Sequence, residues 1–305
     1  MGDAITRAVG FGGMVRVYTG VTTQLVDQAQ RIHDTWPTAT AAFGRVLTGA
    51  ALMAAMGDPE DRLTLQVVGD GPVGRILAVA DGTGHVKGYV DEPHVDLDLN
   101  VRGKLDVGRA VGKGQICVIR DAGLREPYRG VVELVSGEIG EDLANYFLVS
   151  EQTPSAVGVG VRVAPDGHVL AAGGFIIQVL PGADDKIISA LEAIINSLPD
   201  VSTWIAQGAD SRRMLEVLLG GEIDSEPEDL PVALACDCNK ERLLGALISL
   251  GPDELHNLAA EGKDAELVCH FCRTTYYFTP GELSDLAKQA QKPAQQPGSF
   301  KQDVE

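Results

Sequence analysis

Four of the five cysteines in the chain stand in two close pairs. Cys236 and Cys238 form a CxC pair, and about thirty residues later Cys269 and Cys272 form a CxxC pair. Two such pairs, separated by a run long enough to fold back, supply the four ligands that one tetrahedral ion needs. Thiolates suit zinc or an iron–sulfur cluster, and zinc is the usual ion in a closed set of four sulfurs. The spacing therefore predicts one zinc ion per chain.

The residues around the second pair predict a turn between two strands. After Cys272 comes a β-prone run, Arg273 to Phe278, of the kind that closes a zinc-knuckle hairpin over its metal. His270 lies between two of the expected ligands, and His256 falls within a predicted helix. Because four sulfurs already complete the set, we predict that neither histidine binds the metal.

The part of the chain before the cysteines is first rich in predicted strands and then helical. Short β-prone runs separated by Gly, Asp and Pro extend from about residue 62 to 180, and helices are expected over about 22–36, 38–56 and 141–148. The predicted fold class is α+β, with a sheet-rich N-terminal domain, a helical linker region and a small C-terminal zinc-binding module. After Gly182 an apolar stripe recurs at helical spacing, over Ile187, Ile188, Leu191, Ile194, Ile195 and Leu198.

Changes in composition predict the domain boundaries. We expect a core domain over residues 1–182, a helical and acidic linker region over 183–229 and a zinc-binding module over 230–290. Five acids and no base occur between residues 222 and 229, with prolines nearby, which predicts an exposed linker. Prolines and glutamines after residue 290 predict a disordered tail over 291–305.

One glycine pattern resembles a nucleotide-binding fingerprint. Gly69, Gly71 and Gly74 match GxGxxG after a predicted strand, and Asp91 stands at about the distance of a ribose-binding acid. A dinucleotide site needs a helix that begins at the third glycine, but only six residues separate Gly74 from a turn signal at Asp81. We therefore predict a β-turn at this position.

Charge and hydropathy exclude two classes of partner. The net charge is −18, which opposes binding to phosphate groups, so we expect no nucleic acid partner. The most apolar predicted helix, over residues 40–56, carries Arg45 and is short for a membrane span. The first residues show no export signal. The expected location is the cytoplasm, where thiols are normally kept reduced.

The cysteine arrangement near the carboxyl end resembles the heat-shock protein 33 family, the redox-regulated holdase chaperones of bacteria. The resemblance spans roughly residues 5 to 280. It implies an ATP-independent holdase that oxidation with mild unfolding stress activates, and that binds unfolding client proteins as a homodimer. The core domain would bind clients and dimerise. Other segments look like the family's motifs in its order: Gly69 to Pro72, Lys87 to Val90, Tyr146 to Phe147, Ser150 to Ser155 and Ala172 to Gly182.

The chemistry of the four thiols suggests how such a switch works. A module of about sixty residues with few large apolar side chains needs its metal to stay folded. An oxidant converts a thiolate to a sulfenic acid, which a neighbouring thiol captures as a disulfide. Nearness along the chain favours the pairs Cys236–Cys238 and Cys269–Cys272, although the sequence does not fix the pairing. We predict a reduced, zinc-bound, inactive form and an oxidised, metal-free, unfolded and active form.

Three other roles remain open from the residues alone. A purely structural zinc ribbon has the same spacing. A zinc-ribbon module for RNA or the translation machinery would favour a basic stripe around the cysteines, which the acidic balance opposes. A dithiol oxidoreductase normally carries CxxC at the start of a helix, whereas CxxC here leads into a predicted strand.

No catalytic role is expected for the remaining residues. No loop resembles a P-loop, and no Ser-His-Asp set or carboxylate pair can be placed, so we predict that the protein is not an enzyme. The fifth cysteine, Cys117, stands in an apolar predicted strand away from any second thiol. We predict that Cys117 is a buried core residue.

Overall fold

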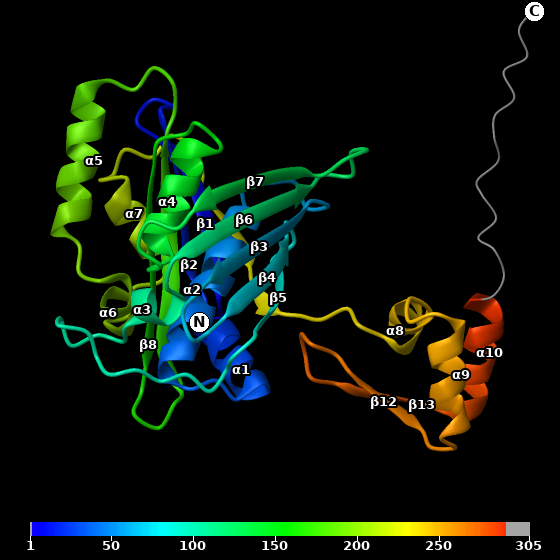
Figure 1. Ribbon diagram of the computed structural model, residues 1–305. Helices are drawn as coiled ribbons and strands as arrows, with labels where there is room; N and C mark the ends of the chain where they lie inside the picture. Colours follow the sequence, from blue (N-terminus) through cyan, green and yellow to red (C-terminus); the bar gives the residue numbers. More distant parts are fainter. Residues whose placement is uncertain (1, 291–305) are drawn as a thin grey trace, which may run out of the picture. The chain divides into compact units, whose positions relative to one another are not determined.

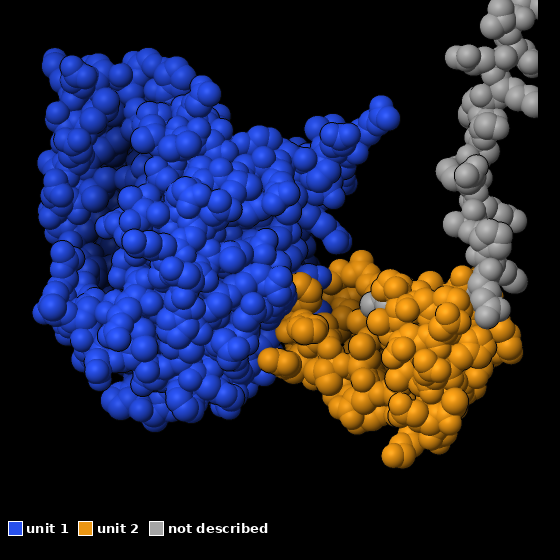
Figure 2. Space-filling view, viewed as in Figure 1, with its two compact units in different colours: residues 1–236 blue, residues 237–305 orange. Residues whose placement is uncertain are grey.

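The computed structural model describes residues 2–290, so the predicted disordered tail over 291–305 lies outside the described residues. The chain divides into two compact units, residues 1–236 and a second unit that begins at Asp237 (Figure 2). Strands and helices are mixed along the chain, which confirms the predicted α+β class. Within residues 2–290, no helix is long and apolar enough to cross a membrane.

Two sheets form the frame of the first unit (Figure 1). The antiparallel five-stranded sheet has the order β10-β1-β2-β9-β8, with β1 Ala4–Gly10, β2 Val15–Val21, β8 Ser155–Val163, β9 Val169–Val179 and β10 Glu228–Pro231. The six-stranded sheet has the order β11-β5-β4-β3-β6-β7, with β3 Arg62–Gly69, β4 Arg75–Asp81, β5 His85–Val90, β6 Gly114–Asp121, β7 Tyr128–Glu133 and β11 Ala233–Leu234.

Helix α2 (Pro37–Ala54) lies between the two sheets and forms the centre of the core. Proline at the first helical position fixes where α2 begins. Sixteen of its 18 residues are buried, and small residues let neighbours approach closely. A Cβ atom at Gly44 would lie 2.5 Å from the Val26 side chain, and one at Gly49 would lie 2.7 Å from Leu143. The small residues of α2 are therefore a packing feature.

Three shorter helices complete the core: α1 (Thr23–His33), α3 (Val107–Val111) and α4 (Gly140–Val149). Helices α1 and α4 agree with the sequence prediction, whereas α3 and strand β1 were not predicted. Strand β1 carries alanine and glycine, which have weak β propensity, and it forms because it pairs with β2 on one side and β10 on the other. The formation of β1 therefore depends on pairing with distant residues and not on its own local sequence.

The glycine pattern at residues 69–74 is a tight connection between strands. Strand β3 ends at Gly69 and β4 begins at Arg75, so no helix follows the third glycine. The Gly71 amide donates to the Val111 carbonyl over 2.9 Å, and a Cβ there would lie 2.3 Å from the Ala110 oxygen. These glycines permit close backbone approach, and the prediction of a turn in place of a nucleotide site is confirmed.

Residues 183–219 form three helices packed on one face of the five-stranded sheet. They are α5 (Asp185–Ser197), α6 (Val201–Ala206) and α7 (Ser211–Leu218). Asp184 caps α5 and Asp210 caps α7, each accepting a hydrogen bond from a first-turn amide. Of the residues in α5, only Leu191 is fully buried. The apolar contact with the sheet includes Val15, Val17, Phe175, Ile177, Leu191, Leu215, Leu218 and Leu219.

The acidic segment that follows is exposed, as predicted, but part of its backbone forms strands. Ile223 forms a bridge with Gly10, β10 pairs with β1, and β11 pairs in parallel with β5. Residues 228–234, where the acidic segment ends and the chain continues toward Cys236, therefore contribute a strand to each sheet of the first unit. The local pattern predicts a linker because charged residues and proline dominate it, whereas the unpaired edges of β1 and β5 supply partners for its backbone.

Asp229 fastens β10 to the neighbouring elements. Its carboxylate accepts hydrogen bonds from the Thr6 hydroxyl at 2.7 Å and from the Arg212 guanidinium at 2.8 Å. The hydrogen bond from Arg212 outweighs partial burial and lowers the pKa of Asp229 below its ordinary 3.8. A carboxyl whose pKa is lowered by folding stabilises the folded state above its unfolded pKa, so this contact acts above about pH 4 and weakens as the pH falls below it.

We predict that Asp229→Asn loosens the acidic segment. Losing this partly exposed contact costs about 0.5 to 1 kcal/mol, which raises hydrogen exchange in β10 and α7 about two- to fivefold at neutral pH. The measurement is hydrogen–deuterium exchange by mass spectrometry. Glu226→Gln removes the same charge from the same segment and keeps the Thr6 and Arg212 contacts, so it serves as the control. Equal exchange in both variants would contradict a role for this contact.

The second unit packs three helices against a hairpin. Its elements are α8 (Lys240–Ile248), α9 (Pro252–Ala260), β12 (Ala265–Val268), β13 (Thr275–Phe278) and α10 (Pro280–Ala290). A capping box begins α10, because the Glu282 carboxylate accepts from the amide and hydroxyl of Thr279, and the Glu282 amide donates to the Thr279 hydroxyl. The fully buried core is small: Leu247, Leu255, Phe278, Leu283, Leu286 and Ala287.

Candidate metal centre

Two irregular segments carry the four paired cysteines. Cys236 and Cys238 lie between β11 and α8, and Cys269 and Cys272 lie in the turn between β12 and β13. The turn is tight, because the Cys269 amide donates to the Thr274 carbonyl and the Arg273 amide donates back to the Cys269 carbonyl, both over 2.9 Å. The second pair thus stands on a hairpin turn, as the β-prone run after it predicts.

The structure brings all four sulfurs together. Every pair of Sγ atoms lies within 4.8 Å, and the sulfurs of Cys238 and Cys272 are 3.3 Å apart. A tetrahedral zinc ion with Zn–S bonds of about 2.3 Å requires sulfurs about 3.8 Å from one another. The spacing therefore fits one zinc ion, and the buried or half-buried positions limit access of water to it.

The two histidines near the cysteines do not belong to this cluster of ligand atoms. His256 lies on α9, where its Nδ1 atom is 2.8 Å from the Pro252 carbonyl of the same helix. That neither histidine binds the metal stays a prediction.

Hydrogen bonding favours the charged form of one thiol. Partial burial raises the pKa of Cys272, but hydrogen bonding with the Thr274 hydroxyl, with the Thr274 amide and with neighbouring thiols lowers it more, to about 7 from 9.0. The Thr274 hydroxyl oxygen lies 3.2 Å from the Cys272 sulfur. A substantial fraction of this thiol is therefore thiolate at neutral pH, and thiolate is both the metal ligand and the group that oxidants attack.

The sulfurs have two polar neighbours that the sequence does not predict, Thr274 and Tyr276. The Tyr276 hydroxyl lies 3.2 Å from the Cys238 sulfur, and this contact raises the pKa of Tyr276 to about 12. Cys272 and Thr274 lie in the turn before β13, and the left-handed backbone of Arg273 interrupts any strand alternation between them. The contact of Tyr276 with Cys238 joins residues 38 positions apart, so no local pattern identifies it.

The helices behind the hairpin are joined to one another by a charged contact. Lys240 follows the first cysteine pair, and its ammonium lies 2.6 Å from the Glu282 carboxylate and over the Phe278 ring. Hydrogen bonds from Lys240 and from Thr279 lower the pKa of Glu282 to about 2. This ion pair links the start of α8 to the first turn of α10. Helix α8 follows the first cysteine pair and α10 follows the hairpin that carries the second, so the contact stabilises the backbone near both pairs.

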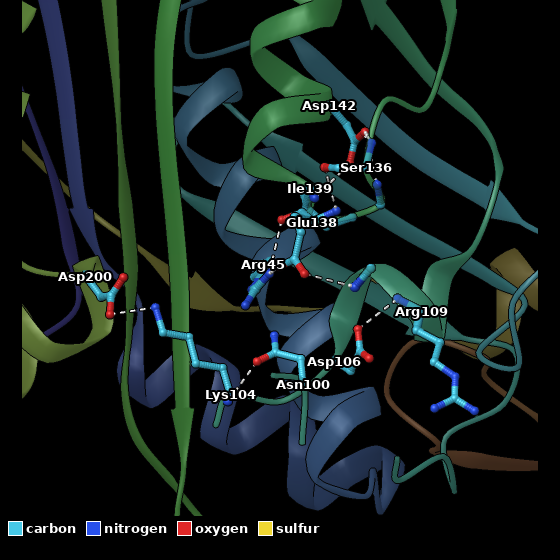
Figure 3. A network of polar contacts seen from close by, with 12 residues as sticks. Arg45, Asn100, Lys104, Asp106, Arg109, Ser136, Glu138, Ile139, Asp142 and Asp200 are labelled. Atoms are coloured by element: carbon cyan, nitrogen blue, oxygen red, sulfur yellow. Dashed lines mark hydrogen bonds and ion pairs between the residues drawn. The ribbon is translucent and has the colours of Figure 1, made fainter. Parts of the chain in front are cut away.

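A groove of about 1130 Å³ is a second feature of the first unit. Its walls come from residues 96–105, strand β8 and the connection between α5 and α6. The Lys104 ammonium lies 2.7 Å from the Asp200 carboxylate, and the two side chains point toward each other in Figure 3. Arg45, on α2, contacts Glu138 beside the same groove. The groove is both apolar and charged, and helix α6 forms part of its wall.

Cys117, the fifth cysteine, lies on β6 with 8% of its surface exposed. The prediction that it is a buried core residue is confirmed. It is not part of the cluster formed by the four paired cysteines.

Comparison with known proteins agrees with this arrangement. A family model described as Hsp33 protein matches residues 3–279. The chain belongs to the Hsp33 family. The resemblance inferred from the cysteines and glycine-rich motifs is therefore confirmed. The match includes both cysteine pairs and covers the first unit and the hairpin of the second.

Individual relatives in the Hsp33 family match almost end to end. The 33 kDa chaperonin of Symbiobacterium thermophilum is 52% identical, over 94% of this chain and 98% of its own length. That of Halalkalibacterium halodurans is 48% identical, over 95% of this chain and 100% of its own. The crystal structure of the 33 kDa chaperonin of Thermotoga maritima aligns with a TM-score of 0.88 at 39% identity, covering 95% of this chain and 99% of that one.

We predict that each of the four clustered cysteines is required for metal binding in this Hsp33 family member. Replacement of any one by serine removes a thiolate ligand, so the zinc content of the reduced protein falls from one ion per chain to well below one. Elemental analysis of the purified variants measures this. Cys117→Ser keeps its zinc and is the matched control. A full equivalent of zinc in Cys236→Ser or Cys269→Ser would contradict the four-sulfur site.

Proposed function

We propose that the chain is a redox-regulated, ATP-independent holdase and not an enzyme. In this proposal the reduced form binds one zinc ion through Cys236, Cys238, Cys269 and Cys272 and is inactive. Oxidation forms disulfides, releases the ion, unfolds the C-terminal module and the linker region, and exposes a surface that binds unfolding proteins. The observation that carries the proposal is a set of four clustered thiols in a unit whose buried core is small.

The size of that core makes the metal important. Six fully buried side chains, one of them alanine, stabilise a unit of this length weakly. Structural zinc contributes on the order of 10 to 16 kcal/mol of apparent binding energy in small modules, because the unfolded chain offers no preformed site. Loss of the ion is therefore expected to unfold the second unit.

Oxidation removes the ligands by a defined reaction. A thiolate attacks a peroxide oxygen, the O–O bond breaks, and the sulfur becomes a sulfenic acid. A second thiolate attacks that sulfur and displaces hydroxide, so one peroxide takes two electrons and leaves one disulfide. Two disulfides consume two peroxides. We propose the pairs Cys236–Cys238 and Cys269–Cys272 from nearness along the chain; all six sulfur pairs lie within 4.8 Å, so the pairing needs to be mapped.

The packing of residues 183–219 supports exposure of client-binding surface. Helix α5 is amphipathic, yet only Leu191 is fully buried, while Ile187, Ile194 and Ile195 are half-buried. Elements with few buried contacts open at low free-energy cost. Undocking would uncover the apolar stripe of α5 and the sheet face beneath it, both of which suit unfolding proteins.

Further parts of the proposal follow from the family. We propose that residues 1–182 bind clients and form a homodimer in the active state, that the protein works in the cytoplasm, and that neither nucleic acid nor a membrane is a partner. The names of the relatives, 33 kDa chaperonins, support a chaperone role. The net charge of −18 supports the absence of nucleic acid.

We predict that zinc loss, disulfide formation and holdase activity appear together. The reduced protein is treated with peroxide at mildly elevated temperature, and zinc release, free thiols and suppression of aggregation of an unfolding test protein are followed in the same sample. We expect oxidation to form two disulfides per chain and to release one zinc ion per chain. We expect holdase activity to appear with these changes and to be lost again on reduction. Light scattering after size-exclusion chromatography is expected to show a dimer in the active sample.

Two results would overturn the proposal. If zinc remains bound after four thiols per chain have been oxidised, the metal is not part of a switch. If zinc leaves and the oxidised protein does not suppress aggregation, the site is only structural. Cys117→Ser should respond as the wild type does, because its thiol lies outside the cluster.

A further inference from the structure

Tyr276 contacts Cys238, one of the four clustered cysteines. It stands on β13, opposite Leu267 of β12, and its ring packs partly against the small core of the second unit. Its hydroxyl oxygen is 3.2 Å from the Cys238 sulfur and 3.2 Å from the Cys238 carbonyl oxygen. One phenol thus contacts both polar acceptors of a residue 38 positions away in the sequence.

We propose that Tyr276 is a positioning residue of the metal centre, which holds Cys238 against the hairpin and favours the reduced, metal-bound state over the oxidised one. This inference rests on the proposed function, since it assumes that the four thiolates bind zinc and that oxidation releases it.

The backbone around the two cysteine pairs explains why such a contact is needed. Cys269 and Cys272 are held by the hydrogen bonds of their own turn and by the ladder of β12 and β13. Cys238 lies in an irregular segment between β11 and α8, outside any strand ladder. The Tyr276 hydroxyl links that segment to β13 directly. Groups that orient a metal ligand in this way typically contribute a factor of about 10 to 100 in metal affinity.

The chemistry of the hydroxyl gives the contact its redox preference. The hydroxyl carries one proton, which in this structure donates to the Cys238 carbonyl oxygen. When Cys238 is a thiolate, which is a good hydrogen-bond acceptor, this proton can turn to the sulfur and stabilise its negative charge. A disulfide sulfur carries no such charge and accepts weakly, so oxidation of Cys238 forfeits most of this stabilisation. The hydroxyl can then donate only to the carbonyl oxygen. Tyr276 therefore stabilises the zinc-bound thiolate selectively.

The test compares Tyr276→Phe with the wild type and with Tyr277→Phe, all full length, reduced and loaded with zinc. Phenylalanine keeps the ring that packs on the core and removes only the hydroxyl. Tyr277 is the next residue of the same strand and is 56% exposed, so its variant is the matched control. Zinc affinity is measured by competition with a chromogenic chelator, and zinc release after peroxide is followed with the same dye.

We expect Tyr276→Phe to weaken zinc binding about tenfold and to speed peroxide-driven zinc release, while Tyr277→Phe matches the wild type. If Tyr276→Phe matches the wild type in both measurements, the inference is wrong and the proposed function is untouched. If Tyr276→Leu loses affinity and Tyr276→Phe does not, the side chain acts by packing alone, which also overturns it. If the wild type binds no zinc or keeps it after oxidation, the proposed function itself fails.

Discussion

The clustering of four cysteine sulfurs is the constraint on which the second unit depends. Sulfurs within 4.8 Å of one another could all be thiolates only with a cation among them, because four negative charges so close repel one another. With a divalent ion bound, the same groups become four strong links between two distant segments of the chain. The buried core behind them is too small to compensate for losing those links. The stability of the unit therefore follows the charge state of its sulfurs.

The helices of the first unit differ widely in burial. This difference indicates which helix can undock from the core at low free-energy cost. Helix α2 has 16 of 18 residues buried between two sheets, whereas α5 has one fully buried residue on a single sheet face. Removing α2 would destroy the core. Undocking α5 exposes half-buried side chains and leaves both sheets paired, so it costs far less free energy. A conditional client-binding surface is physically reasonable only at the second kind of element.

Local patterns predict the parts of the fold that depend on neighbouring residues. The apolar stripe of α5, the β-prone run after Cys272 and the spacing of the cysteines all act within a few residues or through a fixed ligand chemistry. Pairings between distant segments are not visible in this way. Strands β10 and β11 form because the edges of β1 and β5 accept them, although their own residues are typical of a linker. Tyr276 was missed for the same reason, since its partner lies 38 residues away.

The course of the acidic segment gives the proposed switch a physical route along the chain. Strand β11 ends at Leu234, and the Ala235 amide still donates to the Val86 carbonyl over 2.8 Å. The next residue is Cys236, a predicted metal ligand. A strand of two residues holds weakly, so disorder that begins at the cysteines has little to stop it from spreading toward β10. The next stabilising contacts toward the N-terminus are the hydrogen bonds of Asp229 with Thr6 and Arg212. In the proposed switch, the short strand and the exposed charge pair would therefore set how far disorder spreads into the first unit after the metal is lost.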